Sequence, residues 1–293
     1  MFEYAGPLYR PPSEAAHLIL QATIGCSVNH CTFCSMYRHK RFHIKPLPQL
    51  FKEIEHAASA WPTARRVFLA DGDALVLPTD HLERILDHLR RHLPQLQRVS
   101  CYALPANLRK KSLRELNRLA AKKLTLIYYG MESGDANLLK IIRKGATPEG
   151  MAAGVWKAHE AGLKISATVI LGLGGQRLWQ SHIDHTAELI NRVPLSYLST
   201  LQLYLDPHLE AAFLARFTPP FQFQQDHQIL QELAQLVAAI NHPPKRIIFR
   251  SNHASNALAL AGNLPDHQAA LLARIAQAQA NVQGLRPTWT RSL

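Results

Sequence analysis

Short apolar runs alternate with amphipathic segments along most of the chain. Apolar residues recur at helical spacing around residues 50–55 and 81–86, which predicts helices there. Continuous apolar runs predict six buried strands, at residues 18–24, 67–70, 99–103, 124–129, 164–171 and 198–205. Strands that alternate with helices predict a parallel sheet with helices outside it. About six such units are too few for a closed eight-unit barrel, so we expect an α/β fold built as an open, partial (β/α)6 parallel barrel.

Local capping signals place several helix ends between these strands. Ser112 and Glu115 form a capping box, which predicts that a helix begins there. Gly145 is well placed as the C-terminal cap of a short helix, and the next helix begins at Thr147 with Pro148 in its first turn. These signals agree with the alternation of strands and helices.

The last third of the chain has a different pattern. After a break at residues 217–220, the spacing predicts a long amphipathic helix over 226–240, a seventh strand over 246–250 and a final helix through 269–272. We see neither internal repeats nor a long linker. We therefore expect an N-terminal arm over residues 1–16, a core partial barrel over 17–210 and a mainly helical C-terminal extension over 211–293 that packs on the barrel.

Composition narrows the class of protein. The 293 residues are 47% hydrophobic, and 33 Lys and Arg against 21 Asp and Glu give a formal net charge of +12, which favours a polyanionic or acidic partner. The cations are scattered in short groups, however, and many of them are expected simply to face solvent at helix ends. No signal peptide and no membrane span are visible, so we expect a cytoplasmic, reducing setting.

The densest chemical signal is a loop that carries three of the four cysteines. Cys26, Cys31 and Cys34 follow the first apolar run with the spacing C-x4-C-x2-C. Three thiols on one loop can hold three irons of an iron–sulfur cube and leave the fourth iron for another ligand. Such an open iron favours an enzyme over an electron carrier.

Other uses of these thiols remain open from the residues alone. A zinc site could add His30 or His39, although structural zinc usually recruits two separated pairs of ligands. The spacing also matches a two-iron ferredoxin, in which Cys101 would be the fourth ligand. We prefer to interpret Cys101 as a small buried hydrophobe. A disulfide framework is the weakest alternative for a chain of this length.

The cysteine loop, with Phe33 just before its last cysteine, resembles the cluster motif of the radical S-adenosylmethionine (radical SAM) enzymes. The usual spacing there is C-x3-C-x2-C, so this chain has one additional residue between Cys26 and Cys31. The run from Gly130 to Gly145, which contains Glu132, Ser133 and Lys144, is similar to that of the subgroup with methylthiotransferases and oxygen-independent coproporphyrinogen oxidases. The resemblance covers roughly residues 17–205.

The resemblance implies a set of cofactors and contacts at the carboxyl ends of the strands. A [4Fe–4S] cluster on the three cysteines and S-adenosylmethionine are implied, with a reductant such as flavodoxin or ferredoxin. Gly72 and Asp73 stand where the family holds the amino group of S-adenosylmethionine, Glu132 and Ser133 where it holds the ribose, and Phe33 and Gly172 where it contacts the adenine. Taken singly, each of these residues could equally be part of an ordinary turn.

The implied activity is reductive cleavage of S-adenosylmethionine to a 5′-deoxyadenosyl radical, which abstracts hydrogen from a substrate. The polar segment 250–256 offers Arg250 for an anionic group and His253 for a proton, and we expect a small, anionic substrate. The same segment could instead be a turn that caps the last elements. Modification of tRNA or protein is the first alternative function, and nucleic acid is a possible but less favoured partner. A non-catalytic electron-transfer protein is the second.

Overall fold

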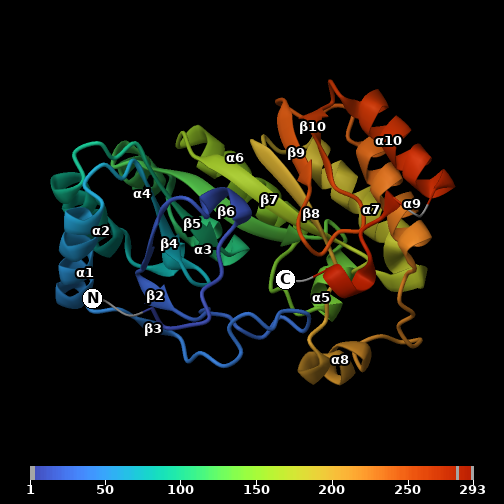
Figure 1. Ribbon diagram of the computed structural model, residues 1–293, viewed down its shortest axis with the longest axis horizontal. Helices are drawn as coiled ribbons and strands as arrows, with labels where there is room; N and C mark the ends of the chain where they lie inside the picture. The colour runs from blue at the N-terminus through green and yellow to red at the C-terminus, as the bar shows by residue number, and fades with distance from the viewer. Residues whose placement is uncertain (1–3, 282–283, 292–293) are drawn as a thin grey trace. The chain divides into compact units, whose positions relative to one another are not determined.

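The computed structural model describes residues 4–281 and 284–291, and its main feature is an eight-stranded, mostly parallel sheet (Figure 1). The strand order is β1-β4-β5-β6-β7-β8-β9-β10, and β2 and β3 form a separate two-stranded ribbon. The strands of the main sheet are β1 (Leu18–Gln21), β4 (Arg66–Ala70), β5 (Arg98–Ala103), β6 (Leu124–Glu132), β7 (Lys164–Leu171), β8 (Tyr197–Gln202), β9 (Ile247–Ser251) and β10 (Leu260–Leu264). The ribbon consists of β2 (Thr23–Ile24) and β3 (His43–Ile44).

All six strands predicted from apolar runs are present, as β1 and β4 to β8, and the predicted seventh strand is β9. β10 was not predicted. It pairs antiparallel with β9 and contains Gly262 and Asn263, two residue types that are depleted in strands. Its pairing partner, rather than its own composition, makes this segment a strand.

The helices lie between the strands as the alternation predicts. They are α1 (Leu47–Ala60), α2 (Thr79–His92), α3 (Pro105–Lys110), α4 (Leu113–Ala121), α5 (Ala136–Ile141), α6 (Pro148–Glu160), α7 (Gly175–Asn191), α8 (Pro207–Leu214), α9 (Asp226–Ala239) and α10 (Gln268–Ala280). Short 3₁₀ turns are η1 (Pro12–Glu14), η2 (Ala74–Val76) and η4 (Thr288–Thr290). The predicted capping box is confirmed, since Ser112 accepts a hydrogen bond from the Glu115 main chain and Glu115 bonds back to Ser112.

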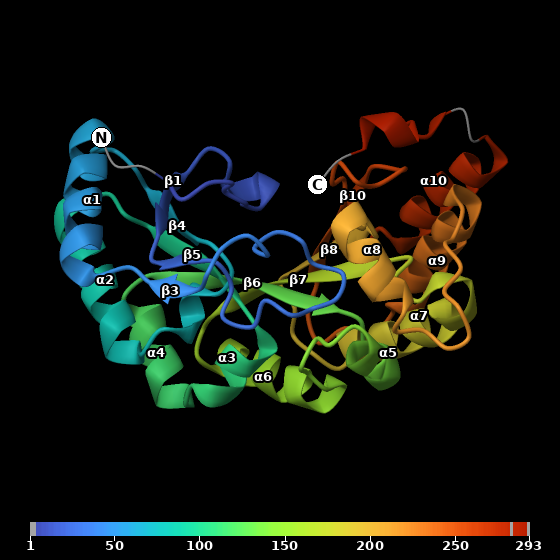
Figure 2. The same cartoon turned by 90° about the horizontal axis from the view of Figure 1, so that it is seen from below.

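The chain forms two compact units. The first comprises residues up to Asn29, 36–129 and 157–165, with β1, β4, β5 and most of β6. Its strands are paired in parallel and apolar on both faces, as in Phe68 and Leu69, both fully buried. Helices α1 and α2 pack side by side in both views of the molecule (Figures 1 and 2).

The segment before β1 is tied to the first unit by one buried carboxylate. Glu14, in η1, is fully buried and accepts hydrogen bonds from Tyr128 (2.6 Å), Ser100 (3.0 Å) and Arg98 (2.9 Å). His17 contacts its other oxygen at 2.5 Å. These partners satisfy a carboxylate that would otherwise be costly to bury.

The second unit comprises residues 30–35, 130–156 and the chain from 166 onward. Its strands β8 and β9 run parallel to β7, in a register that pairs Leu171 with Gln202. Helix α9 packs against both α7 and α10 (Figure 1). None of the helices within residues 4–281 and 284–291 is long and apolar enough to cross a membrane.

Candidate functional site

In the first unit, the end of β4 is hydrogen-bonded to the start of the cysteine loop. Asp71 is fully buried with a left-handed φ of 63°, and its Oδ2 accepts from the main-chain N–H of Gly25 at 2.8 Å. The ammonium of Lys40 lies 2.9 Å from the same oxygen. This buried ion pair fixes the conformation in which the chain leaves β4. Asp71 belongs to the predicted run of residues 71–73, whereas no signal in the sequence identified Lys40 as its partner.

Gly72 lies directly against Cys26. The Gly72 N–H donates to the Gly25 carbonyl at 2.9 Å, and a Cβ added at Gly72 would lie 2.5 Å from both Cα and Cβ of Cys26. Only glycine permits such a close approach of two backbones. The predicted glycine is thus required by packing against the first cysteine.

Asp73 holds the cysteine loop through Ser27. Its Oδ1 accepts from the Ser27 N–H at 2.9 Å, and its Oδ2 accepts from the Ser27 hydroxyl. The carboxyl is fully buried, and burial raises its pKa, although the bonds from Ser27 and Asn107 oppose the shift. The described contacts of Asp73 therefore position the loop, and its contact with S-adenosylmethionine remains a prediction.

In the second unit, Cys31 and Cys34 lie on a short turn anchored to α5. The Cys34 N–H donates to the Cys31 carbonyl at 3.2 Å, and the Thr32 N–H donates to the carbonyl of Ile142, just past α5, at 3.0 Å. Phe33 is half-buried between them. None of the four cysteines is in a disulfide, so the thiols required by the predicted cluster are present.

A buried ion pair at the end of β6 lies beside these thiols. Lys144 donates from Nζ to Oε1 of Glu132 at 2.7 Å, and both side chains are at least nine-tenths buried. Burial lowers the pKa of Lys144, but the negative charges of Glu132, Cys31 and Cys34 raise it by more than burial lowers it. The pKa of Lys144 is therefore raised overall. A permanently charged ammonium thus lies within electrostatic range of two motif cysteines.

The backbone around Glu132 is shaped for this pair. Glu132 has a φ of 63°, the left-handed region that a glutamate rarely adopts. A Cβ at Gly130 would lie 2.2 Å from Glu132 Oε1 and 2.8 Å from Lys144 Nζ. The strained φ and the glycine together place the carboxylate at the strand end, which is consistent with a functional position. Glu132 was predicted from sequence as a ribose contact, but Lys144 was named only as part of the similar run and as the residue before a helix cap.

Ser133 is engaged inside the second unit. Its hydroxyl lies 2.8 Å from Nδ1 of His182, and His182 Nε2 lies 3.0 Å from the Ile170 carbonyl. Burial lowers the pKa of His182 to about 4, so the ring is neutral at pH 7. The neutral ring therefore donates from Nε2 to Ile170 and accepts from Ser133 at Nδ1. The predicted ribose contact of Ser133 remains a prediction.

Gly172, at the end of β7, is bonded to a glutamate from α9. The Gly172 N–H donates to Oε1 of Glu232 at 2.9 Å, and Gly172 has a φ of 81°. Burial raises the pKa of Glu232 to about 8, so this carboxyl is mostly protonated at pH 7. His182 Nε2 lies 3.5 Å from Glu232 Oε1, but both groups are neutral at that pH and do not form an ion pair. Among the described residues, Glu232 Oε2 has no hydrogen-bond partner.

The segment after β9 is organised as a turn. The Asn256 side chain donates to the Thr200 carbonyl at 2.7 Å and accepts from the Gln202 N–H at 2.7 Å, which caps the end of β8. His253 Nδ1 accepts from the Ser255 N–H at 3.1 Å, and burial lowers its pKa. Arg250 is exposed and donates to the Phe249 carbonyl at 2.7 Å. These contacts are those of a turn that caps the end of β8, which was the alternative interpretation of this segment. The catalytic roles of Arg250 and His253 remain predictions.

Cys101 lies in a different environment from the three motif cysteines: it is buried, whereas they are partly exposed. It lies in β5, is fully buried, and burial raises the pKa of its thiol to about 12. A thiol that resists ionisation is a poor metal ligand. The interpretation of Cys101 as a buried hydrophobe agrees with this setting.

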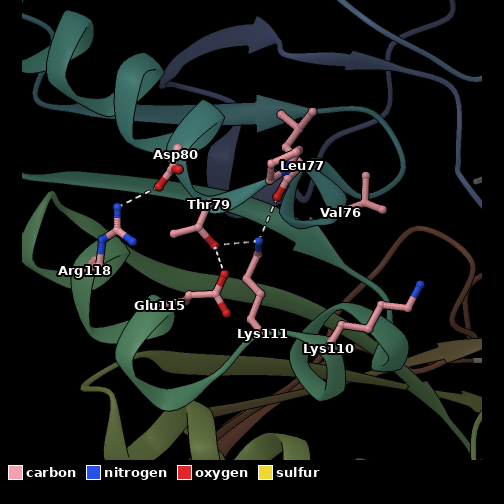
Figure 3. Close-up of a pocket in the computed structure, with 9 residues that line it drawn as sticks. Val76, Leu77, Thr79, Asp80, Lys110, Lys111, Glu115 and Arg118 are labelled. Atoms are coloured by element: carbon pink, nitrogen blue, oxygen red, sulfur yellow. Dashed lines mark hydrogen bonds and ion pairs between the residues drawn. The ribbon is translucent and has the colours of Figure 1, made fainter.

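A separate polar pocket of about 430 Å³ opens in the first unit between η2 and α4. Two of the cations that line it already have partners within the protein. Lys111 donates to the Leu77 carbonyl at 2.7 Å and to Thr79, and Arg118 pairs with Asp80 (Figure 3). Thr79 in turn donates to Glu115 at 2.7 Å. These bonds join α2 to α4, and the pocket contains none of the predicted cofactor contacts.

The sequence model of the Radical SAM superfamily matches residues 20–190. Among curated proteins, the heme chaperone HemW of Bacillus subtilis (strain 168) is 21% identical over 184 residues, which are 60% of this chain and 48% of that protein. The chain therefore spans about half the length of this relative.

Two solved structures show the same fold. Coproporphyrinogen III oxidase from Escherichia coli matches 76% of this chain and 51% of its own, with a TM-score of 0.56 and 18% identity. The maturase HydG from Carboxydothermus hydrogenoformans matches 88% of this chain and 56% of its own, with a TM-score of 0.51 and 17% identity. The prediction of an α/β partial barrel with a mostly parallel sheet is confirmed.

Proposed function

Because this chain belongs to the radical SAM superfamily, we propose that it cleaves S-adenosylmethionine reductively and abstracts hydrogen from a small, anionic substrate. The family implies a [4Fe–4S] cluster and S-adenosylmethionine as cofactors, and a reductant. When bound, these cofactors supply the electron and the 5′-deoxyadenosyl radical, and the protein supplies orientation and exclusion of water.

The observation that carries the proposal is the buried Glu132–Lys144 pair beside Cys31 and Cys34. Thiolates that ligate iron are anionic, and a buried ammonium offsets part of that charge. Glu132 reaches the same place from the end of β6, where the family's ribose contact stands. The residues present therefore fit both implied cofactors.

We assign the remaining residues to complementary tasks. Cys26, Cys31 and Cys34 are the proposed cluster ligands, and Asp73 holds the loop that carries Cys26 by bonding Ser27. Gly72, which is half-buried, and the Asp73 carboxylate are the proposed acceptors for the ammonium group. Phe33 and Gly172 are the proposed adenine contacts, and Glu232 fixes the Gly172 main chain. Glu132 and Ser133 are the proposed ribose contacts.

For the substrate, we propose that His253 and Arg250 supply a proton and a cation near the end of β9. The Asn256 cap supports this placement, because it holds the 251–256 turn at the carboxyl ends of β8 and β9. An oxygen-sensitive cluster also supports a reducing, cytoplasmic setting and a donor such as flavodoxin or ferredoxin.

The test is anaerobic reconstitution with iron and sulfide, followed by reduction and assay of 5′-deoxyadenosine. Wild-type protein is expected to form it, and Cys31→Ser and Cys34→Ser are expected to lose both cluster and product. Cys101→Ala is the matched control and is expected to keep both. Loss of the cluster in Cys101→Ala would instead indicate a four-cysteine electron carrier and contradict the proposal.

A tetrapyrrole is the second candidate for the substrate class. It is favoured by two similar proteins, a heme chaperone and coproporphyrinogen III oxidase. Product formation should be compared with coproporphyrinogen III, with small carboxylates and with tRNA, while heme is titrated in parallel by its visible spectrum. Stimulation by tRNA alone would favour the RNA-modifying alternative.

A further inference from the structure

Three potential metal ligands converge between α1 and α2 of the first unit. Glu55 projects from α1, and His88 and His92 project from α2. One ligand atom from each lies within 4.8 Å of the other two. The Nε2 atoms of His88 and His92 lie 3.1 Å and 4.0 Å from Oε1 of Glu55.

The two helices hold these side chains together for local reasons. His88 and His92 are four residues apart, so they share one face of α2, and their ring centroids are 4.4 Å apart. Phe51 of α1 stacks on His88 with a centroid distance of 4.1 Å and an interplanar angle of 11°. The orientation of the buried His88 ring is therefore set by packing rather than by the carboxylate alone.

The His88 ring also has a hydrogen-bond partner on α1. It is hydrogen-bonded to the Phe51 main chain. An imidazole must be neutral to bind a metal. Because Nε2 faces Glu55, the main-chain bond falls to Nδ1, which is the usual way that a ligating histidine is oriented.

We propose that Glu55, His88 and His92 bind a divalent transition metal ion, with Zn²⁺ as the best fit and water in the fourth position. Two imidazoles and one carboxylate with an open position are a well-known zinc donor set. Ligand atoms about 2.0–2.2 Å from a tetrahedral zinc ion are roughly 3.2–3.6 Å apart. The His92 contact needs to shorten by about half an ångström from its present 4.0 Å, which a half-exposed side chain can do.

The site is chemically distinct from the cysteine motif. Its three ligands contain no sulfur, and none of them is assigned to the proposed reaction. All three come from α1 and α2, so the site connects only these two helices. The bound ion is expected to fasten these two helices. The competing interpretation is a hydrogen bond between His88 and Glu55 that stabilises the helix pair without any metal.

The experiment uses the full chain after anaerobic loading of the iron–sulfur cluster. One equivalent of Zn²⁺ is added, unbound ion is removed, and the zinc K-edge absorption is recorded, because this signal is independent of iron. A nitrogen and oxygen shell at about 2.0–2.1 Å is expected, without sulfur at about 2.3 Å. Zinc should also raise the melting temperature.

The test variants are Glu55→Gln and His92→Gln, because both side chains are partly exposed and their replacement leaves the core intact. Each is expected to weaken zinc binding by at least about tenfold, since even outer partners of a metal site contribute that much. His242→Gln, an exposed histidine in the second unit, is the matched control and should bind zinc as the wild type does.

The outcomes separate this proposal from the proposed function. Iron content and 5′-deoxyadenosine formation are expected to be unchanged in both variants. A sulfur shell in the wild type, or zinc binding of equal strength in wild type, Glu55→Gln and His92→Gln, would overturn the metal site. Neither result would affect the proposed reaction, whose ligands are the cysteines.

Discussion

Lys144 is a buried cation whose described electrostatic neighbours are Glu132, Cys31 and Cys34. Removal of its charge should make the cluster harder to reduce, because the added electron loses a nearby positive charge. We expect Lys144→Met to lower the reduction potential by tens of millivolts, where about 59 mV corresponds to a tenfold change for one electron. An anaerobic redox titration followed by electron paramagnetic resonance measures this shift.

Two further variants test whether the change in reduction potential comes from the Lys144 charge itself. Lys140→Met removes an exposed lysine from α5 and should leave the potential unchanged. Lys144→Met alone leaves Glu132 buried without its partner, which costs about 3–5 kcal/mol, so the double variant with Glu132→Gln should recover stability. An unchanged potential in a folded Lys144→Met protein would show that this ammonium does not act on the cluster.

Glu232 gives a prediction for pH dependence. Its pKa rises from 4.5 in the unfolded chain to about 8 in the fold because of burial. Between these values the unfolded state has released a proton that the folded state keeps, so stability falls as pH rises and levels off above about pH 8. Wild type should lose up to about 1.4 kcal/mol per pH unit relative to Glu232→Gln.

Melting temperatures of the two proteins between pH 7 and 8 provide the measurement. In this range His182 is neutral in the folded state, and little of its titration in the unfolded chain remains. Parallel curves for wild type and Glu232→Gln would mean that the carboxyl ionises normally inside the fold.

At the scale of elements, the close approach of the β4 end to the cysteine loop is open to test. In Gly72→Ala, a Cβ would meet Cys26 at 2.5 Å, so one of the two backbones must shift. We expect this variant to fold but to incorporate much less iron, measured as iron per chain after reconstitution. Gly6→Ala is the matched control, since a Cβ added there would meet no atom within 4 Å beyond its chain neighbours. Normal iron loading in Gly72→Ala would show that the loop tolerates the shift.

The parallel strands could be predicted from sequence because each is buried on both faces. Such a strand is a continuous apolar run, which can be recognised without knowing the strands that it pairs with. The cysteines were also recognisable, because their spacing is local. Glu232 was not, because it lies on an amphipathic helix 60 residues from Gly172, and its burial depends on how α9 packs. Lys144 and Glu14 were missed for a similar reason: each is explained by buried partners that its own segment does not reveal.

For the whole molecule, the net charge of +12 favours some non-specific binding of RNA at low salt. Several of the cations, however, serve inside the fold: Lys40 pairs with Asp71, Lys45 with Glu53 and Lys144 with Glu132, all three pairs buried. We therefore expect tRNA binding to be weak and non-specific. It should decline steeply between about 50 and 200 mM salt, as binding through phosphates alone does.

Filter binding of tRNA across this salt range, paired with 5′-deoxyadenosine assays, distinguishes a charge effect from a substrate. The expected result is parallel loss of tRNA and of an unrelated RNA of equal length, with no stimulation of product by either. Tight binding of tRNA that persists at 200 mM salt and raises product formation would reverse the order of the candidates. It would require base or shape contacts beyond the phosphates, and the small anionic substrate would then give way to RNA modification.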